Sequence, residues 1–169
     1  MNNISFRNDI LPLKSVLYRL ALRITDDEEE AKDIVQETLI KVWNKREEWN
    51  EIASIEAFCL TICRNLSLDS LKRHSHKMTT LTDLGQQGDN NIGPYEQMMQ
   101  KDRFELVRKM VNSLPEKQRS CMQLRDFEGK SYKEIAMIMG ISEDQVKVNI
   151  FRARQTIKER YQNIDNYGL

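Results

Sequence analysis

The chain has 169 residues, of which 40% are hydrophobic and 31% are charged, a composition that excludes a fibrous or wholly disordered protein. Its formal net charge is zero, which argues against a uniformly basic nucleic-acid binder. The charge is nevertheless uneven, because residues 147–160 carry five basic side chains and one acidic side chain. This local excess keeps nucleic-acid binding open.

Three amphipathic helices are predicted in the first part of the chain, where apolar residues recur at steps of three and four. The first covers residues 10–24, and Thr25 is expected to end it and to cap the second. The second begins with a run of acidic residues, which complement the positive end of the helix dipole, and continues to about residue 49. The third covers residues 56–74. No strand-like alternation appears anywhere.

Residues 77–93 lose the helical pattern and gather Gly, Asn, Asp and Thr, as flexible connectors do. The periodic pattern returns after Pro94. We therefore predict an all-α fold with two small helical domains, residues 1–76 and 98–169, joined by a flexible linker over residues 77–97.

Capping signals predict the helix starts of the second domain. A serine followed three residues later by Glu or Gln can satisfy two backbone N–H groups at a helix start, and this signature occurs at Ser113, Ser131 and Ser142. Gly140 falls just past an apolar run, where a left-handed residue is needed to end a helix. The last two starts therefore predict a helix, a tight turn and a second helix.

The second helix of this pair has an apolar face and a basic face on a helical wheel. Such a helix has the size to enter the major groove of DNA. Side chains with donors and acceptors suited to base edges are Gln145, Asn149 and Arg152. Those suited to phosphates are Lys147, Arg154 and Lys158. Val148 is suited to a thymine methyl group.

Other functional classes find little support in the sequence. Its three cysteines are odd in number and lie in apolar helical patterns, so we expect core packing in a reducing compartment. No phosphate-binding glycine loop, metal-ligand cluster or nucleophile–base set appears, so we predict no enzyme and no cofactor. Without an uninterrupted apolar run of membrane length, we expect no direct membrane insertion and a cytoplasmic location.

Three stretches, taken in order, resemble the extracytoplasmic-function (ECF) sigma factors of bacterial RNA polymerase. "DDEEEAKDIVQETLIKVW" is similar to sigma regions 2.1 to 2.2, and "AFCLTICRNLSLDSLKR" to regions 2.3 to 2.4. "LPEKQRSCMQLRDFEGKSYKEIAMIMGISEDQVKVNIFRARQTIKE" is similar to region 4. The resemblance covers nearly all of residues 9–161, and the ECF group also lacks a middle domain.

The resemblance implies contacts with polymerase and with promoter DNA. In the family, region 2.2 docks on the coiled coil of the polymerase beta-prime subunit, and the matching residues here are Asp33, Gln36, Glu37 and Lys41. Region 2.4 recognises and opens the minus-10 element, and the matching residues are Arg64, Asn65, Asp69, Lys72 and Arg73. Region 4 reads the minus-35 element with its second helix and packs on the beta flap.

The implied function is transcription initiation with core RNA polymerase at specific promoters. ECF factors are often restrained by a membrane-anchored anti-sigma factor, which makes such a protein a candidate partner. The sequence "QVKVNIFRAR" differs from "TVKSRLHRAR", which is frequent in the family, so the family's base preference cannot be transferred to this chain. The alternative is an autonomous helix-turn-helix regulator that binds duplex DNA as a dimer, although no heptad seam is evident.

Overall fold

The computed structural model describes the backbone of residues 3–78 and 95–166 and the side chains of residues 3–75 and 101–163. Every regular element in these residues is a helix, and the predicted all-α fold is confirmed. The chain divides into two compact units, residues 1–84 and 85–169. Most of the predicted linker lies outside the described residues, and its two ends fall in helices that finish at Met78 and begin at Tyr95.

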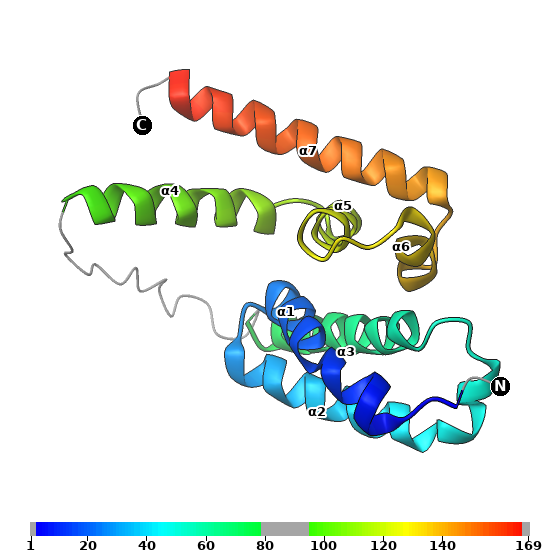
Figure 1. Ribbon diagram of the computed structural model, residues 1–169. Helices are drawn as coiled ribbons and strands as arrows, with labels where there is room; N and C mark the ends of the chain where they lie inside the picture. The colour runs from blue at the N-terminus through cyan, green and yellow to red at the C-terminus, as the bar shows by residue number, and fades with distance from the viewer. Residues whose placement is uncertain (1–2, 79–94, 167–169) are drawn as a thin grey trace. The chain divides into compact units, whose positions relative to one another are not determined.

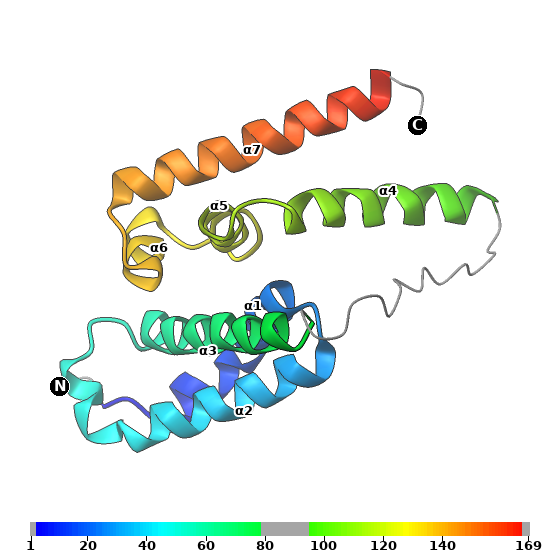
Figure 2. The ribbon, with the colours of Figure 1, turned by 180° about the vertical axis from the view of Figure 1, so that it is seen from behind.

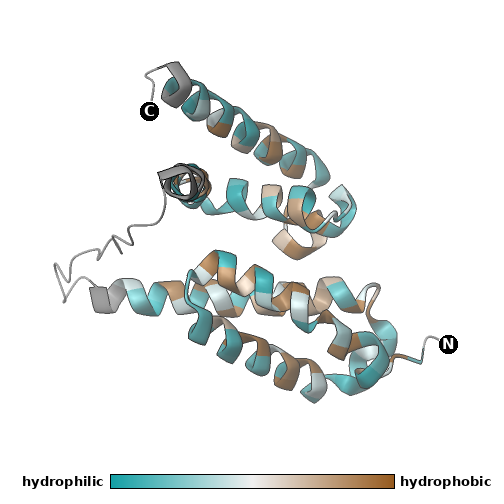
Figure 3. Ribbon diagram, turned by 60° about the vertical axis from the view of Figure 1, so that its left-hand side comes forward, coloured by the Kyte–Doolittle hydropathy of each residue, from teal (hydrophilic) through white to brown (hydrophobic). Residues whose placement is uncertain are grey.

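The first unit is built from three helices that pack against one another: α1 (Lys14–Thr25), α2 (Glu28–Asn44) and α3 (Ile55–Met78). Figures 1 and 2 show the three side by side from opposite directions. Figure 3 shows apolar and polar residues interspersed along these helices. The core of the first unit includes the following buried side chains: Leu17, Leu20, Ile34, Val42 and Leu60.

Short helical turns complete this unit, namely η1 (Phe6–Ile10), η2 (Leu11–Leu13) and η3 (Arg46–Glu51). The ring of Phe6 lies 5.4 Å from that of Trp43 and 6.5 Å from that of Trp49. The Trp49 indole is buried and donates a hydrogen bond to the Val42 carbonyl oxygen at 3.0 Å. This aromatic cluster ties the start of the chain to the end of α2.

Asp27, not Thr25, caps α2, so the predicted cap was wrong. The Asp27 carboxylate accepts hydrogen bonds from the backbone N–H groups of Glu29 and Glu30 at 3.0 and 3.1 Å. The Thr25 hydroxyl instead donates to the Ala21 carbonyl oxygen at 2.8 Å, within the last turn of α1. Asp26 then takes a left-handed conformation (φ 55°), which ends α1 and leaves Asp27 extended for capping.

The second unit contains α4 (Tyr95–Asn112), α5 (Glu116–Met122), η4 (Gln123–Phe127), α6 (Tyr132–Met139) and α7 (Glu143–Asn166). Helix α7 packs against α4, α5 and α6 (Figure 1). The core of this second unit includes a cluster of Val111, Leu114, Met122 and Ala153.

The helix start predicted at Ser113 was also wrong. The Ser113 hydroxyl donates to the Met110 carbonyl oxygen at 2.7 Å, and α5 begins at Glu116, immediately after Pro115. The Glu116 carboxylate accepts a hydrogen bond from the Ser120 hydroxyl at 2.8 Å. Pro115 is the physical reason, because the residue before a proline is disfavoured in the α conformation, so Leu114 does not become the first helical residue that a cap at Ser113 requires.

All three cysteines are buried and free, in agreement with the expected core packing. The Cys63 thiol lies 3.3 Å from the Leu17 carbonyl oxygen. Burial, with a smaller contribution from the neighbouring Cys63, raises the pKa of Cys59 from 9.0 to about 12. Burial also raises the pKa of Cys63, to about 11.

These two pKa values predict alkaline instability of the first unit. The unfolded chain ionises both thiols near pH 9 while the folded chain keeps them neutral. The two neutral thiols therefore contribute their full stabilisation of the folded state below pH 9. This contribution falls as the pH rises above 9 and is lost once the pH has passed 11 to 12. By pH 10 the loss is about 1 kcal/mol per thiol. Urea unfolding followed by circular dichroism from pH 8 to 10 measures this loss. The double variant Cys59→Ala, Cys63→Ala should show a shallower pH dependence, and an equal slope in both proteins would contradict the prediction.

None of the helices in the described part of the chain is long and apolar enough to cross a membrane.

Candidate nucleic-acid interface and protein-docking surface

The helix-turn-helix has both of the predicted caps. The Ser131 hydroxyl accepts from the backbone N–H of Glu134 at 3.1 Å at the start of α6. Gly140 ends α6 in a left-handed conformation with φ 68°. At the start of α7, the Ser142 hydroxyl accepts from the Gln145 backbone N–H at 3.2 Å, and the Gln145 side chain accepts from the Ser142 N–H at 3.0 Å. Local chemistry therefore sets the boundaries of this turn.

Helix α7 buries the first part of the face that the wheel predicts and exposes the other face, whereas Ile157 is half-buried and Tyr161 is 37% exposed. Its buried side chains are Val146, Ile150 and Ala153. The exposed residues include six of the seven predicted for DNA contact, namely Gln145, Lys147, Val148, Arg152, Arg154 and Lys158. The seventh, Asn149, is half-buried. The basic side of α7 is therefore open on its own unit.

Two of the side chains predicted to meet base edges already make hydrogen bonds within α7. The Gln145 side-chain oxygen is held by the cap, and the Asn149 amide donates to the Gln145 carbonyl oxygen at 2.8 Å. Both retain further hydrogen-bonding capacity, because a carboxamide has two donors and one acceptor oxygen. Arg152 is exposed, and its planar guanidinium suits bidentate contact with a base.

Arg154 is engaged by Asp126 of η4. The Arg154 Nε donates to Asp126 Oδ2 at 3.1 Å, and Nη2 donates to Oδ1 of the same carboxylate. Hydrogen bonding to Asp126 raises the pKa of Arg154 further above its usual value, so the guanidinium stays charged. The sequence predicted Arg154 as a phosphate contact, and its partner 28 residues away was not foreseen.

An aromatic platform beside α7 was also missed from the sequence. The Tyr132 ring, at the start of α6, lies 4.4 Å from the Arg125 guanidinium carbon and 5.5 Å from the Lys147 ammonium nitrogen. Such cation–π contacts favour a fixed position for each charge. The side chain of Phe151, on α7, is also 68% exposed on the same unit as these cations. Val148 of the same helix is 44% exposed, so α7 presents apolar area among its basic side chains.

The α3 residues predicted to contact the minus-10 element differ in how exposed their side chains are. Asn65, Asp69, Lys72 and Arg73 are exposed. Arg64 is only 9% exposed and already has interaction partners in the protein. The contact predicted for Arg64 stays a prediction, and it would require this side chain to leave its buried position.

The end of α3 is fastened to the start of α2 by Glu30. The Ser70 hydroxyl donates to Glu30 Oε1 at 2.8 Å, and His74 Nε2 lies 3.8 Å from Glu30 Oε2. This polar link holds the exposed part of α3 in a fixed orientation on α2.

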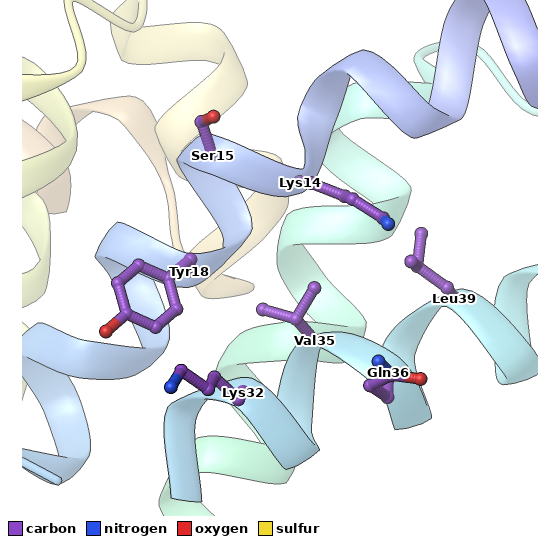
Figure 4. Close-up of a pocket in the computed structure, with 7 residues that line it drawn as sticks. All are labelled: Lys14, Ser15, Tyr18, Lys32, Val35, Gln36 and Leu39. Atoms are coloured by element: carbon purple, nitrogen blue, oxygen red, sulfur yellow. The ribbon is translucent and has the colours of Figure 1, made fainter. Parts of the chain in front are cut away.

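The residues predicted for polymerase docking form an exposed strip on α2: Asp33, Gln36, Glu37 and Lys41. Beside the strip, a groove of about 410 Å³ runs between α1 and α2. Figure 4 shows Val35 between the helices, the Lys14 side chain extending toward Leu39, and Tyr18 beside Lys32. The groove therefore has an apolar floor and cationic edges.

A second hollow continues along α2 and shares Gln36 and Leu39 with the groove. Ile40 and Trp43 line it and are 59% and 45% exposed. The Arg46 guanidinium carbon lies 4.8 Å from the Trp43 ring. Apolar side chains exposed beside charged ones are typical of protein–protein contact surfaces.

Comparison with known families places both units. Residues 10–77 match the model described as "Sigma-70 region 2", and residues 104–157 match "Sigma-70, region 4". The ECF RNA polymerase sigma factor SigL of Mycobacterium tuberculosis is 30% identical over 152 residues, which cover 89% of this chain and 85% of that protein. The probable RNA polymerase sigma factor RfaY of Xanthomonas campestris is 29% identical over 154 residues, covering 88% of this chain and 38% of that protein.

Among solved structures, the fold is similar to the sigma factor RpoE of Bartonella quintana in complex with the anti-sigma factor NepR. The TM-score is 0.70 at 21% identity, with 93% of this chain and 96% of that chain covered. The chain therefore belongs to the ECF group of the sigma-70 family. As an ECF sigma factor it directs RNA polymerase to promoters, and the family is not enzymatic, as the sequence predicted.

Proposed function

We propose that the two units divide the work of promoter recognition. Helix α7 enters the major groove at the minus-35 element, and the exposed part of α3 contacts the minus-10 element. The observation that carries the proposal is the amphipathic arrangement of α7, which buries Val146, Ile150 and Ala153 and leaves the basic side uncovered on its unit. The preceding α6 and the capped turn support α7 as a helix-turn-helix does.

We propose further that the exposed strip of α2 docks on core RNA polymerase, with the adjacent groove and Trp43 adding apolar contact area. Four polar side chains on one helix face provide specific hydrogen bonds and ion pairs, while Ile40 and Trp43 supply the desolvated centre that strong interfaces need. The beta-prime coiled coil is the partner that the strip suits, and the beta flap is the corresponding partner of region 4.

An anti-sigma factor is a further proposed partner. The similar Bartonella quintana sigma factor was solved in complex with one. An inhibitor that covered the groove and strip of α2 would compete with polymerase for the same area.

The experiment that tests the function combines the full chain with core RNA polymerase. We expect the two to co-purify and to transcribe from a subset of a randomised promoter library, with little promoter binding by the chain alone. An autonomous dimeric regulator would instead protect its site from nuclease without polymerase. That outcome, together with failure to bind core enzyme, would refute the proposal.

A further inference from the structure

The ion pair between Asp126 and Arg154 joins α7 to the segment that precedes α6. Both carboxylate oxygens of Asp126 accept hydrogen bonds from one guanidinium, through Nε at 3.1 Å and through Nη2. A bidentate pair of this kind restricts orientation as well as distance, because the guanidinium and the carboxylate are both planar. The pair therefore constrains how α7 is rotated about its own axis.

The position of Arg154 on α7 differs from that of Arg152. At 100° per residue, Arg154 projects next to the buried stripe that contains Ile150, whereas Arg152 projects on the far side of the helix. The Arg154 side chain is 52% exposed and the Asp126 side chain 35% exposed. The guanidinium is thus held at the edge of the packed face, against η4.

The residue next to Asp126 contacts Tyr132 of α6, which in turn contacts α7. Arg125 Nη1 donates to the Lys130 carbonyl oxygen at 2.9 Å, and its guanidinium lies over Tyr132. Lys147 of α7 lies over the same ring. Asp126 of η4 therefore contacts α7 directly, and Arg125 of η4 is connected to α7 only through the Tyr132 ring.

We propose that Asp126 is a positioning residue for promoter binding and that Arg154 anchors α7 to it, instead of contacting a phosphate. The inference rests on the proposed role of α7 in DNA binding. By fixing the rotation of α7, the pair presents Arg152, Lys147 and Lys158 to the duplex together. A loss of this constraint lets α7 rotate, which misaligns the planar guanidinium of Arg152 with its base pair, while the flexible Lys147 and Lys158 side chains still reach phosphates.

The direction in which one substitution changes DNA affinity distinguishes the two possible roles of Arg154, as a phosphate contact or as an anchor of α7. If Arg154 contacted a phosphate, replacing Asp126 by the neutral, nearly isosteric asparagine would remove a repulsive charge and strengthen DNA binding or leave it unchanged. If Asp126 positions α7, the same substitution weakens binding. A phosphate contact also contributes about one unit to the slope of log affinity against log salt, and an internal anchor contributes none.

The test uses holoenzyme assembled from the full chain and core polymerase, with a promoter duplex that wild-type holoenzyme selects from a randomised library. We expect Asp126→Asn and Arg154→Met each to lower promoter affinity roughly 3- to 10-fold, and the double variant to lose no more than either single variant. The salt slope should stay at the wild-type value. Asp126→Glu keeps the charge and should retain most of the affinity.

Lys158→Met serves as the matched control, because its salt slope should fall by about one. Thermal unfolding checks that each variant folds. If Arg154→Met does not fold, the direction of the affinity change in Asp126→Asn decides between the two roles by itself. A salt slope lowered by Arg154→Met, or tighter binding by Asp126→Asn, overturns the inference while Lys158→Met still behaves as expected. If Lys158→Met and Arg152→Ala also leave promoter binding unchanged, the proposed DNA surface itself fails, and this inference with it.

Discussion

Replacing Glu37 by lysine should weaken binding to core RNA polymerase by roughly 10- to 100-fold, because the reversed charge places like charges together in the proposed interface. Glu37 is exposed near the middle of α2, next to the groove and to Ile40. Its side chain contributes nothing to the core, so the fold should survive. Affinity of the full chain for labelled core enzyme measures the effect, and thermal unfolding monitors the fold.

Glu51→Lys is the matched control for this charge reversal. Glu51 is also exposed but lies at the end of η3, outside the strip. We expect its polymerase affinity to match that of the wild type. An equal loss in both variants would show a general effect of charge, and loss of the thermal transition in Glu37→Lys would assign the residue a structural role.

Replacing Arg152 by alanine should lower affinity for the selected promoter by about 1 to 3 kcal/mol, the value of a bidentate contact to a base pair. Arg152 is exposed on the side of α7 opposite the buried stripe. Arg152→Lys retains the positive charge without the planar fork, so it should recover phosphate attraction but not the base preference. Equilibrium binding of holoenzyme to the selected promoter measures the affinity, and sequencing of transcripts from a randomised promoter library measures the base preference.

The control for Arg152 is Arg103→Ala. Arg103 is an exposed arginine on α4, outside the proposed DNA surface. Its removal lowers the net charge by the same amount and should leave the selected promoter sequence unchanged. A promoter profile for Arg152→Ala that matches the wild type would mean that Arg152 faces solvent.

Local chemistry in the sequence was sufficient for the helix-turn-helix. The Ser131 and Ser142 caps and the left-handed Gly140 involve residues within three or four positions of one another, so their pattern can be recognised in the chain itself. The same holds for the apolar stripe of α7, which follows from helical periodicity alone. Where two caps compete within a few residues, as with Thr25 and Asp27, periodicity does not decide between them.

Contacts between distant residues were decided only by tertiary structure. The exposed pattern of α7 made Arg154 look equivalent to Lys158, because nothing in the neighbouring sequence indicates that Asp126 lies beside it. Arg64 is similar, since a charged residue in an amphipathic helix is expected at the surface, yet α3 packs between neighbours and leaves it 9% exposed. The sequence by itself determined helices, their periodic faces and the family, because these depend on short-range chemistry and motif order. Which charged side chains remain available to partners depends on packing between segments far apart in the chain, and only the folded units decided it.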